Sequence, residues 1–448
     1  MAGMPSKQRV PRRTSSAPAS KAARRRSPGS GGVSPKAPHL LEPKLRYVTD
    51  RSYKSFHEAV SRGFQEQERD EVADFDRPIV ENDRFFGFGV GNRWVSTCGA
   101  FSRSITVPGG ADVPVAAVTV VTVHPPYRRR GLLSSMMQHQ LEDVASRGEP
   151  LAALWASEAS IYGRFGYGPA AARAGLSGAN RRLTFLPGVG ITGSVDEVSK
   201  KQFLSVAPAL HEAGRPDRPG GLNRDQTWWK FPTFDLEFVR DGASELRYLL
   251  HYSDSGDADG FAMYRYKPDW DATEPSGEIR IHEIRADDPG AYAGLWRYLL
   301  DLDLARKFRL RNAPVDEPLR HLVTDARAVA TQISDNLYLR VVDVAAALQA
   351  RRYPAEIDIV IEVTDPLLPA NTGRYRLQGA PDAVAVDRVR KAADLSLSVL
   401  ELGAIYLGGV PLTDLQRVGR VTEHRTGAVA AASTAFGWHR APWCPDNF

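Results

Sequence analysis

Cysteine is nearly absent from this sequence. Only Cys98 and Cys444 occur among 448 residues, with no Cys-x-x-Cys pair and no Cys/His cluster at the spacing of metal ligands. This scarcity excludes a disulfide framework and a structural zinc site, so we expect no metal. It also suits a reducing compartment, and we expect a cytoplasmic protein.

The sequence also lacks a hydrophobic run long enough to cross a membrane. Its longest apolar-looking stretch, residues 113–123, is short of the ~20 residues that a spanning helix requires, and it contains Thr119 and Thr122. The basic N-terminus is not followed by the apolar segment of a secretory signal. We therefore expect no membrane partner.

Beyond its N-terminal segment the chain has no excess of positive charge. Residues 1–44 carry ten lysines and arginines against the single acidic residue Glu42, a net charge of +9, whereas the whole chain carries +5. Residues 45–448 therefore carry −4. A mildly acidic body argues against a nucleic-acid-binding function and suits an enzyme whose substrates are cations.

The N-terminal segment is rich in Ser, Pro, Ala, Lys and Arg and has almost no large apolar side chains. Such a segment cannot bury enough apolar surface to offset the entropy of ordering, so we predict that residues 1–44 form a disordered basic tail. Its charge has two interpretations: a tether to DNA, RNA or a membrane, or a solvated extension. We favour the solvated extension and expect nucleic-acid binding only weakly and only through this tail.

The rest of the chain is long enough for about two to four domains, and its apolar and charged fractions are those of a globular protein. Apolar residues at helical spacing, Phe56, Val60 and Phe64, open the first unit. Strand-like runs, a helix with one apolar face and a further strand follow, over residues 94–101, 104–107, 113–123, 133–144 and 151–156.

A second unit, from about residue 192 to 321, repeats this order of strands, helix and strand. The repeated order predicts a duplicated architecture, although no repeat is visible residue by residue. A third unit starts near Leu337 with an alternating strand over residues 357–363. Its last residues, 438–448, are unusually aromatic for a terminus, which predicts that the C-terminus docks against the protein.

One segment, residues 121–133, carries recognisable chemistry. A β-branched strand, Val121-Thr122-Val123, runs through the basic turn Arg128-Arg129-Arg130-Gly131 directly into an amphipathic helix. A turn of this kind aims free backbone N–H groups and the positive end of a helix dipole at one point, which suits a pyrophosphate. Gly131 allows a close approach of the backbone, and the arginines add charge.

This segment resembles the Arg/Gln-x-x-Gly-x-Gly/Ala signature of the GNAT acetyltransferases, with Leu133 in place of the final Gly or Ala. The order Arg-Arg-Arg-Gly-Leu-Leu is similar to the Eis (enhanced intracellular survival) branch of that superfamily. Residues 156–170, Ala-Ser-Glu-Ala-Ser-Ile-Tyr-Gly-Arg-Phe-Gly-Tyr-Gly-Pro-Ala, resemble the block after the fifth strand of this family. Residues 336–348 resemble the start of its sterol-carrier-protein-like domain, so the resemblance covers nearly all of residues 45–448.

The resemblance implies an α+β fold and a homohexamer. It implies an N-terminal GNAT domain over residues 45–183, a second GNAT-like domain without a coenzyme A site over residues 184–331, and a sterol-carrier-protein-like (SCP2-like) domain over residues 332–448. The sequence independently favours an inactive second unit. Asp287 and Asp288 stand at the corresponding turn, and their carboxylates would repel a pyrophosphate.

The resemblance further implies an N-acetyltransferase that uses acetyl-CoA as acyl donor and primary amines of the aminoglycoside, polyamine or lysine type as acceptors. Such an amine arrives protonated, so a base must remove its proton, and the departing thiolate needs an acid. The family implies Tyr162 as the acid and the terminal carboxylate of Phe448 as the base. By position, the residues implied for acetyl-CoA are Val121, Thr122, Val123, Arg129, Arg130, Gly131, Leu132, Leu133, Ser134, Ser157 and Glu158.

Two alternatives stand beside this interpretation. The chain could be a non-catalytic ligand-binding or scaffold protein that uses the SCP2-like domain, although the intact basic turn argues against it. Tyr162, taken without the family, could merely pack. Trp155 directly precedes Ala-Ser-Glu, where the family also carries His, and it bears on the choice of acceptor.

Overall fold

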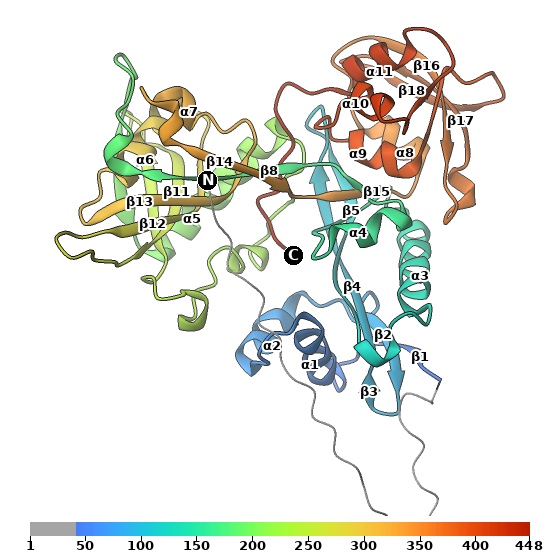
Figure 1. Ribbon diagram of the computed structural model, residues 1–448, viewed down its shortest axis with the longest axis horizontal. Coiled ribbons are helices and arrows are strands. Elements are labelled where there is room, and N and C mark those ends of the chain that lie inside the picture. The colour runs from blue at the N-terminus through green and yellow to red at the C-terminus, as the bar shows by residue number, and fades with distance from the viewer. Residues whose placement is uncertain (1–41) are drawn as a thin grey trace, which may run out of the picture. The chain divides into compact units, whose positions relative to one another are not determined.

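Three β-sheets with their helices make up the part of the chain that the structure, a computed structural model, describes: residues 42–448 (Figure 1). This mixture of helices and sheets confirms the expected α+β class. The predicted tail lies, up to residue 41, outside the described residues, and the first strand begins at Lys44. None of the helices described is long and apolar enough to cross a membrane.

The first sheet has the strand order β1-β2-β4-β5-β6-β15-β7, with β3 paired to β2. The two strands expected over residues 94–101 and 104–107 are one strand, β4, because its pairing with β5 continues from Ser96 to Thr106. The bounds are β1 Lys44–Tyr47, β2 Phe86–Val90, β3 Arg93–Trp94, β4 Ser96–Thr106, β5 Asp112–Val123, β6 Leu151–Leu154, β7 Gly168–Pro169 and β15 Tyr338–Val341.

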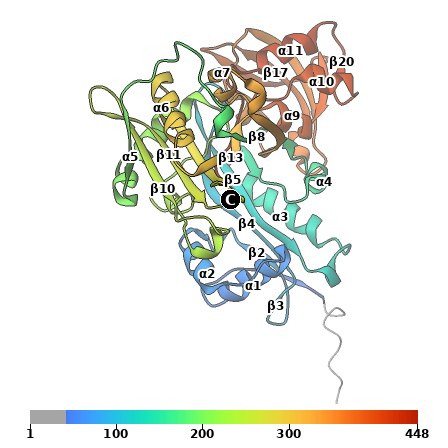
Figure 2. The same ribbon diagram turned by 60° about the vertical axis from the view of Figure 1, so that its left-hand side comes forward.

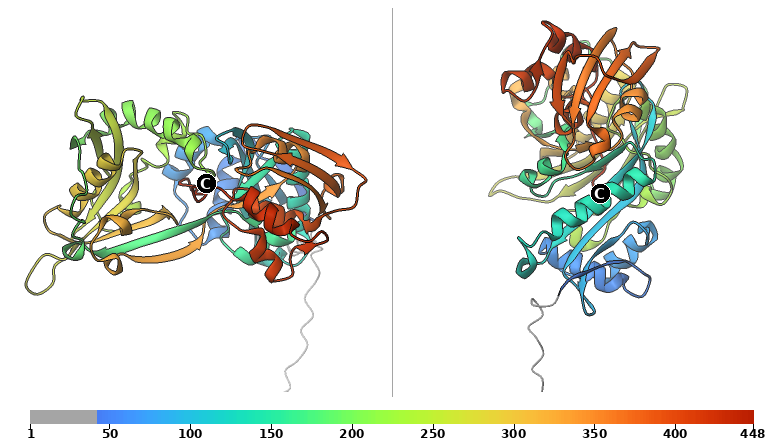
Figure 3. Two further views of the ribbon diagram at one scale, coloured as in Figure 1. Left: turned by 90° about the horizontal axis from the view of Figure 1, so that it is seen from above. Right: turned by 90° about the vertical axis from the view of Figure 1, so that its right-hand side faces the viewer.

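Helices cover both faces of this sheet: α1 (Tyr53–Phe64) and α2 (Asp70–Asp76) on one side and α3 (Leu132–Ser146) on the other. Successive side chains of a strand point to opposite faces of the sheet, so neighbouring apolar residues of β5 can pack against helices on both sides. Ala116 of β5 packs in one hydrophobic cluster with Met137 of α3. Its neighbour Ala117 packs with Phe56 of α1. Figure 3 shows α3 lying along the strands in its right-hand view.

The second sheet repeats this plan with the order β14-β8-β13-β12-β11-β10-β9. Phe203 of α5 and Leu295 of α6 pack against its opposite faces. The bounds are β8 Ala172–Ala179, β9 Ser194–Val198, β10 Arg247–Tyr252, β11 Ala258–Lys267, β12 Gly277–Ala286, β13 Ala305–Pro314, β14 Ala330–Asp335, α5 Lys200–Gly214, α6 Pro289–Leu300 and α7 Leu319–Leu322.

Each of the first two sheets contains one strand that lies outside the residue range expected for its domain. Strand β8 precedes the boundary expected at residue 184, yet it pairs with β13 and β14 of the second sheet. Strand β15 follows the boundary expected at residue 332, yet it pairs with β6 and β7 of the first sheet. Both strands lie near the junction of the two sheets (Figure 1). The domain boundaries themselves stay predictions.

The third sheet, of order β18-β17-β16-β19-β20, belongs to the C-terminal part of the chain. Leu402 of its helix α9 packs in one cluster with Leu339 of β15, which attaches this part to the first sheet. The bounds are β16 Ile357–Thr364, β17 Gly373–Gly379, β18 Val384–Val389, β19 Leu395–Ser398, β20 Thr422–Glu423, α8 Val344–Ala350, α9 Val399–Ile405, α10 Leu412–Arg417 and α11 Ala428–Phe436.

The chain ends in a segment without helix or strand, residues 437–448. It returns to the middle of the described region, where the C-terminus lies beside β4, β5 and β13 (Figure 2). The backbone N–H of Trp443 donates to the carbonyl of Pro219 at 2.9 Å, and that of Cys444 donates to Asn336 Oδ1 at 2.9 Å. The terminus therefore docks, as its aromatic composition predicts.

Candidate active site

The first sheet has a gap along the second half of β5, where the neighbouring strand β6 no longer pairs with it. Strands β5 and β6 pair in parallel only between residues 115–118 and 151–154, after which β6 ends and β5 continues to Val123. Val120 sits at an irregularity of β5 with a φ of +50°, and Thr97 Oγ1 donates to its carbonyl at 2.6 Å. Past residue 118, β5 has no strand partner on its β6 side among the described residues. Its backbone is therefore available to an extended ligand.

Directly after β5, the chain presents the open N-terminus of α3. Gly131 is the N-cap residue, with a φ of +81° that favours glycine, and no side chain caps the helix. A Cβ atom on Gly131 would meet nothing within 4 Å. Arg128 Nε donates to the carbonyl of Val123 at 3.1 Å, which ties the turn to the strand. The arrangement supplies uncapped N–H groups and the positive end of a helix dipole.

A cavity of about 510 Å³ lies against this turn. Ten of the eleven residues predicted for acetyl-CoA line it, and Arg130 does not: its guanidinium lies over the ring of Tyr127, 5.3 Å from the centroid. The ten are Val121, Thr122, Val123, Arg129, Gly131, Leu132, Leu133, Ser134, Ser157 and Glu158.

Sequence reasoning missed several residues of this cavity. Arg164 stands inside the family-like block over residues 156–170, where its charge was a visible signal. Gly63 and Phe64 come from the end of α1, far from the turn in sequence. A Cβ on Gly63 would lie 2.5 Å from Thr122, so glycine is what lets α1 approach β5. No local pattern in the sequence marks that approach.

A second cavity, of about 880 Å³, adjoins the first. Its walls are rich in aromatic side chains, and Trp228, Phe231, Phe234 and Phe238 reach it from the second GNAT-like unit. Glu66 and Asp76 add carboxylates. The two cavities share four residues: Phe64, Val121, Ser157 and Tyr162.

Tyr162 ends the short helix α4 (Ala159–Tyr162) and is 5% exposed. Burial raises the pKa of its hydroxyl to about 12, and the neighbouring Cys98 and Glu158 add to the rise. Tyr162 therefore keeps its proton at neutral pH, as a proton donor must. It is the one predicted catalytic residue that faces both cavities, since Phe448 lines only the second.

The other predicted catalytic group enters the second cavity from the chain's end. Asn447 and Phe448 line it together with Trp155, and the Phe448 ring packs beside the cluster of Phe101 and Trp228. The indole Nε1 of Trp155 is buried and has no hydrogen-bond partner among the described residues. The structure thus brings Tyr162, Val121 and the terminal residue around one cavity.

The corresponding helix of the second unit, α6, is closed. Asp288 is its N-cap residue, and Asp288 Oδ1 accepts hydrogen bonds from the N–H groups of Gly290 at 2.8 Å and Ala291 at 2.9 Å. The donors that an anion would use are therefore satisfied by the chain's own carboxylate. No group of three or more His, Cys, Asp and Glu that could hold a metal ion occurs within residues 42–448.

Comparisons with known proteins agree with this geometry. Two models described as acetyltransferase (GNAT) domains match residues 44–170 and 220–341, and a sterol carrier protein domain model matches residues 344–445. An uncharacterized N-acetyltransferase of Streptomyces avermitilis is 44% identical over 377 residues, covering 83% of this chain and 90% of the relative. N-acetyltransferase Eis of Mycobacterium tuberculosis is 34% identical over 369 residues, covering 81% and 87%.

Solved structures give the same result. Eis1 of Mycobacterium abscessus superimposes with a TM-score of 0.77 at 33% identity and covers 91% of this chain and all of its own. A GCN5-related N-acetyltransferase of Anabaena variabilis shares the fold, with a TM-score of 0.78 at 20% identity and 91% coverage of this chain.

The first unit has an uncapped helix N-terminus next to the point where β5 and β6 stop pairing, and the second unit repeats the same plan. Together with the two matching GNAT domain models, this makes the protein a GNAT-type N-acetyltransferase. The tandem GNAT units and the SCP2-like domain expected from the sequence are confirmed. Within that class, the chain belongs to the Eis family of N-acetyltransferases.

Proposed function

We propose that this protein transfers the acetyl group of acetyl-CoA directly to a primary amine, with the donor in the first cavity and the acceptor in the second. One observation carries the proposal: Val121 and Tyr162 line both cavities, so the two substrates can meet there. Direct transfer needs such a meeting point, because the nucleophile must come within contact distance of the thioester carbon.

The donor is held by the first unit alone. The pyrophosphate occupies the turn from Arg129 to Ser134, where the uncapped N–H groups of α3 receive it. The pantetheine arm pairs with the open edge of residues 121–123, and Ser157 and Glu158 line its far side. The second unit holds no coenzyme A, because Asp288 already occupies the N–H groups of α6.

The proposed chemistry uses two groups of this chain. The terminal carboxylate of Phe448 takes a proton from the ammonium of the acceptor, and the neutral amine attacks the thioester. The new C–N bond forms as the C–S bond breaks, which leaves an N-protonated amide and the thiolate of coenzyme A. Tyr162 donates its proton to the thiolate, and its phenolate takes up the proton that the amide nitrogen loses. The carboxyl group of Phe448 then releases its proton to solvent.

Charge in the second cavity supports a cationic acceptor of the aminoglycoside, polyamine or lysine type. The cavity offers the carboxylates of Glu66 and Asp76 and many aromatic faces, and both attract ammonium groups. His57 lies among them, 2.9 Å from Glu68 and 3.8 Å from Asp76. Burial opposes its charge, but these two carboxylates outweigh burial and raise the pKa of His57. Arg69 and a protonated His57 also line the cavity and offset part of its negative charge, so the carboxylate of Glu66 and the aromatic faces carry the argument for a cationic acceptor.

We also propose the homohexamer that the family resemblance implies and the cytoplasmic location that the scarcity of cysteine led us to expect. The open edge of β14, with Ile333 56% exposed, supports association with further copies. Light scattering of the purified protein tests the hexamer, and cell fractionation tests the location.

The test of the proposed function is a panel of amines incubated with acetyl-CoA, with thiol release and the mass of the product as readouts. Each amine is paired with its N-acetylated form, which has no nucleophilic nitrogen and should release no thiol. Calorimetry should show one acetyl-CoA site per chain. Thiol release at equal rates with and without amines would contradict amine acetylation, and two sites per chain would contradict the inactive second unit.

A further inference from the structure

The last eleven residues of the chain, 438–448, form a strap that the second unit holds by hydrogen bonds. At its start, the N–H of Ala441 donates to Asp316 at 3.0 Å, and Arg218 donates to the carbonyl of Ala441 at 2.7 Å. Further along, Asn312 Nδ2 donates to the carbonyls of Cys444 and Pro445, each at 3.2 Å. These contacts hold backbone, so they fix the path of the strap.

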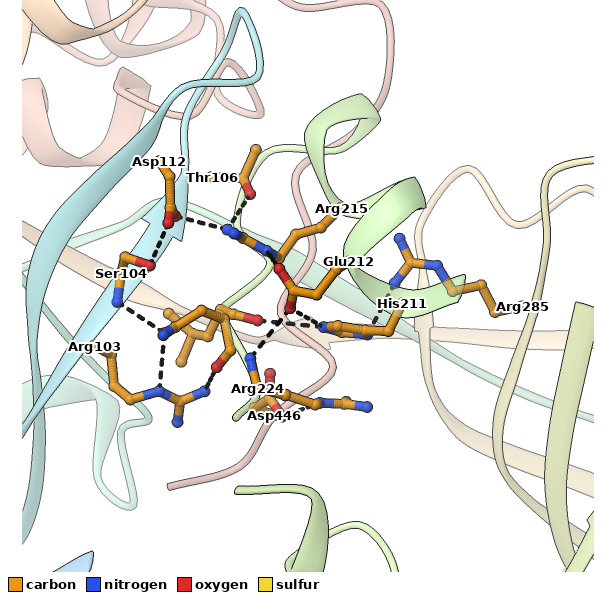
Figure 4. A network of polar contacts seen from close by, with 12 residues as sticks. Arg103, Ser104, Thr106, Asp112, His211, Glu212, Arg215, Arg224, Arg285 and Asp446 are labelled. Atoms are coloured by element: carbon orange, nitrogen blue, oxygen red, sulfur yellow. Dashed lines mark hydrogen bonds and ion pairs between the residues drawn. The ribbon is translucent and has the colours of Figure 1, made fainter. Parts of the chain in front are cut away.

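The final contact of the strap is different, because it joins two charged side chains. Asp446 Oδ1 accepts from Arg224 Nε at 2.7 Å (Figure 4). Arg224 Nη1 donates to Glu283 Oε2 at 3.0 Å. Asp446 is 8% exposed, and Arg224 is 5% exposed. Charge-assisted hydrogen bonds between buried partners are the strongest and most directional that a protein makes with its own side chains.

Asp446 lies only two residues before the end of the chain, so its contact with Arg224 limits where the terminal carboxylate can lie. With Asp446 held, two further residues separate it from the end of the chain, which limits the reach of the carboxylate to about 7 Å. Without it, the carbonyl of Asp446 keeps only a contact from Cys444 Sγ at 3.3 Å, and a thiol is a weak donor. The next hydrogen bond from outside the strap is at the carbonyl of Pro445, from which the reach is about 10 Å. The volume open to the carboxylate then grows roughly threefold, as the cube of the reach.

We propose that Arg224 and Asp446 are positioning residues for acetyl transfer, and that the second unit, which has no open coenzyme A site, serves as the dock for the catalytic terminus. The inference rests on the proposed role of the Phe448 carboxylate. Proton transfer requires near-contact geometry, and a displacement of about 1 Å can cost on the order of a hundredfold in rate. Release of Asp446 therefore lowers kcat by more than the threefold gain in volume, on the order of tenfold.

The charges around Arg224 make Asp446 the residue to change. Removal of Arg224 would leave two buried carboxylates, Asp446 and Glu283, without their shared cation. Removal of Asp446 leaves Arg224 still paired with Glu283. Asp446→Ala therefore releases the strap end without stranding a buried charge, and Asp446→Asn serves if the alanine variant does not fold.

Cys444 offers a route to the experiment, since it allows ligation of a synthetic peptide of residues 444–448 to the remainder of the chain. Four proteins are made: the peptide carries either the parental Asp446 or the Asp446→Ala substitution, and each version ends in a carboxylate or in a carboxamide. The carboxamide removes the base and keeps every side chain. The matched control is Asp316→Ala, which frees only the N–H of Ala441, far from the terminus. The hydrogen bonds of Arg218 to Ala441 and of Asn312 to Cys444 and Pro445 still hold the strap.

The expected results separate positioning from plain stability. With a terminal carboxylate, Asp446→Ala lowers kcat about tenfold and leaves the KM for acetyl-CoA near that of the parent, and any fall in Tm is the same in both series. With a terminal carboxamide, kcat is already low and Asp446→Ala lowers it no further. Asp316→Ala leaves kcat unchanged in the carboxylate series.

Each contrary result has its own meaning. An equal fall on Asp446→Ala in both series would show a structural role and overturn the inference. No fall in the carboxylate series, while the carboxamide itself lowers kcat, would overturn the inference and leave the proposed base standing. A carboxamide protein as active as the carboxylate protein would remove the proposed base, and the positioning role with it.

Discussion

Arg340 on β15 and Asp365, just after β16, form an ion pair whose two side chains are fully buried. Arg340 Nη2 donates to both carboxylate oxygens at 2.8 Å, and Nε donates to the carbonyl of Phe165 at 2.8 Å. The pair therefore joins the C-terminal part of the chain to the segment that follows Tyr162. Because both partners are buried, loss of one charge would leave the other without a countercharge away from water.

Asp365→Asn should destabilise the protein by about 3–5 kcal/mol, because it leaves Arg340 buried without a countercharge. Thermal or urea unfolding measures the change. The control is Glu274→Gln, which breaks the ion pair with Arg181, whose side chains are 41% and 58% exposed; the Tm should hardly move. A similar loss in both variants would mean that burial of the Arg340 pair is unimportant.

Gly131→Glu should abolish acetyl-CoA binding in a calorimetric titration. The new side chain would start where a Cβ now has open space and would place a carboxylate at the N-terminus of α3, against the pyrophosphate. The control is Asp288→Ala, which removes the cap of α6 and costs about 1 kcal/mol of stability but no binding. Binding that survives Gly131→Glu, or is lost with Asp288→Ala, would place coenzyme A elsewhere.

Tyr162→Phe keeps the ring and removes only the proton donor, so kcat should fall by ~100-fold while the KM for acetyl-CoA stays the same. Tyr167→Phe is the matched control. Its ring lies 6.1 Å from that of Tyr162, its hydroxyl contacts Gln140 at 3.4 Å, and it lines neither of the two cavities. If both variants keep the parental kcat with chemistry rate-limiting, Tyr162 only packs.

The pH dependence of kcat should show no alkaline fall from Tyr162 up to about pH 10. A general acid must be protonated, and burial raises the pKa of Tyr162 to about 12, so its acid form persists throughout this range. Because the pKa of Tyr162 is raised, its hydroxyl loses the proton only at higher pH than a free tyrosine does. An alkaline limb below pH 10 that disappears in Tyr162→Phe would contradict this account.

Extension of the chain beyond Phe448 should abolish acetyl transfer, because it moves the terminal carboxylate without changing a side chain. Deletion of Phe448 should do the same, whereas Phe448→Leu should retain part of the activity. An N-terminal tag, attached outside the described residues, is the control and should leave kcat unchanged. A C-terminally tagged enzyme, shown by mass spectrometry to be intact and equally active, would exclude the terminal-carboxylate mechanism.

Several elements of the fold and site follow from local sequence. The helix of residues 132–146 and the strand of residues 112–123 carry period-specific apolar patterns that extend over many residues. The turn from Arg128 to Gly131 was recognisable because a phosphate site built from consecutive backbone N–H groups needs only one short segment. The residues that the family resemblance implies for acetyl-CoA extend beyond this turn to Ser157 and Glu158, and ten of the eleven line one cavity.

The tertiary structure alone decided which distant segments meet. Insertion of β15 beside β6, the aromatic wall that Phe231 and Phe238 supply from the second unit, and the approach of Gly63 to β5 join residues far apart in the chain. The same holds for the contact of Arg224 with Asp446, which closes a loop of more than two hundred residues. Periodicity reports only on a residue's near neighbours, whereas these contacts depend on how whole sheets pack. The sequence by itself therefore determined the basic turn before α3, and the packing determined the second cavity.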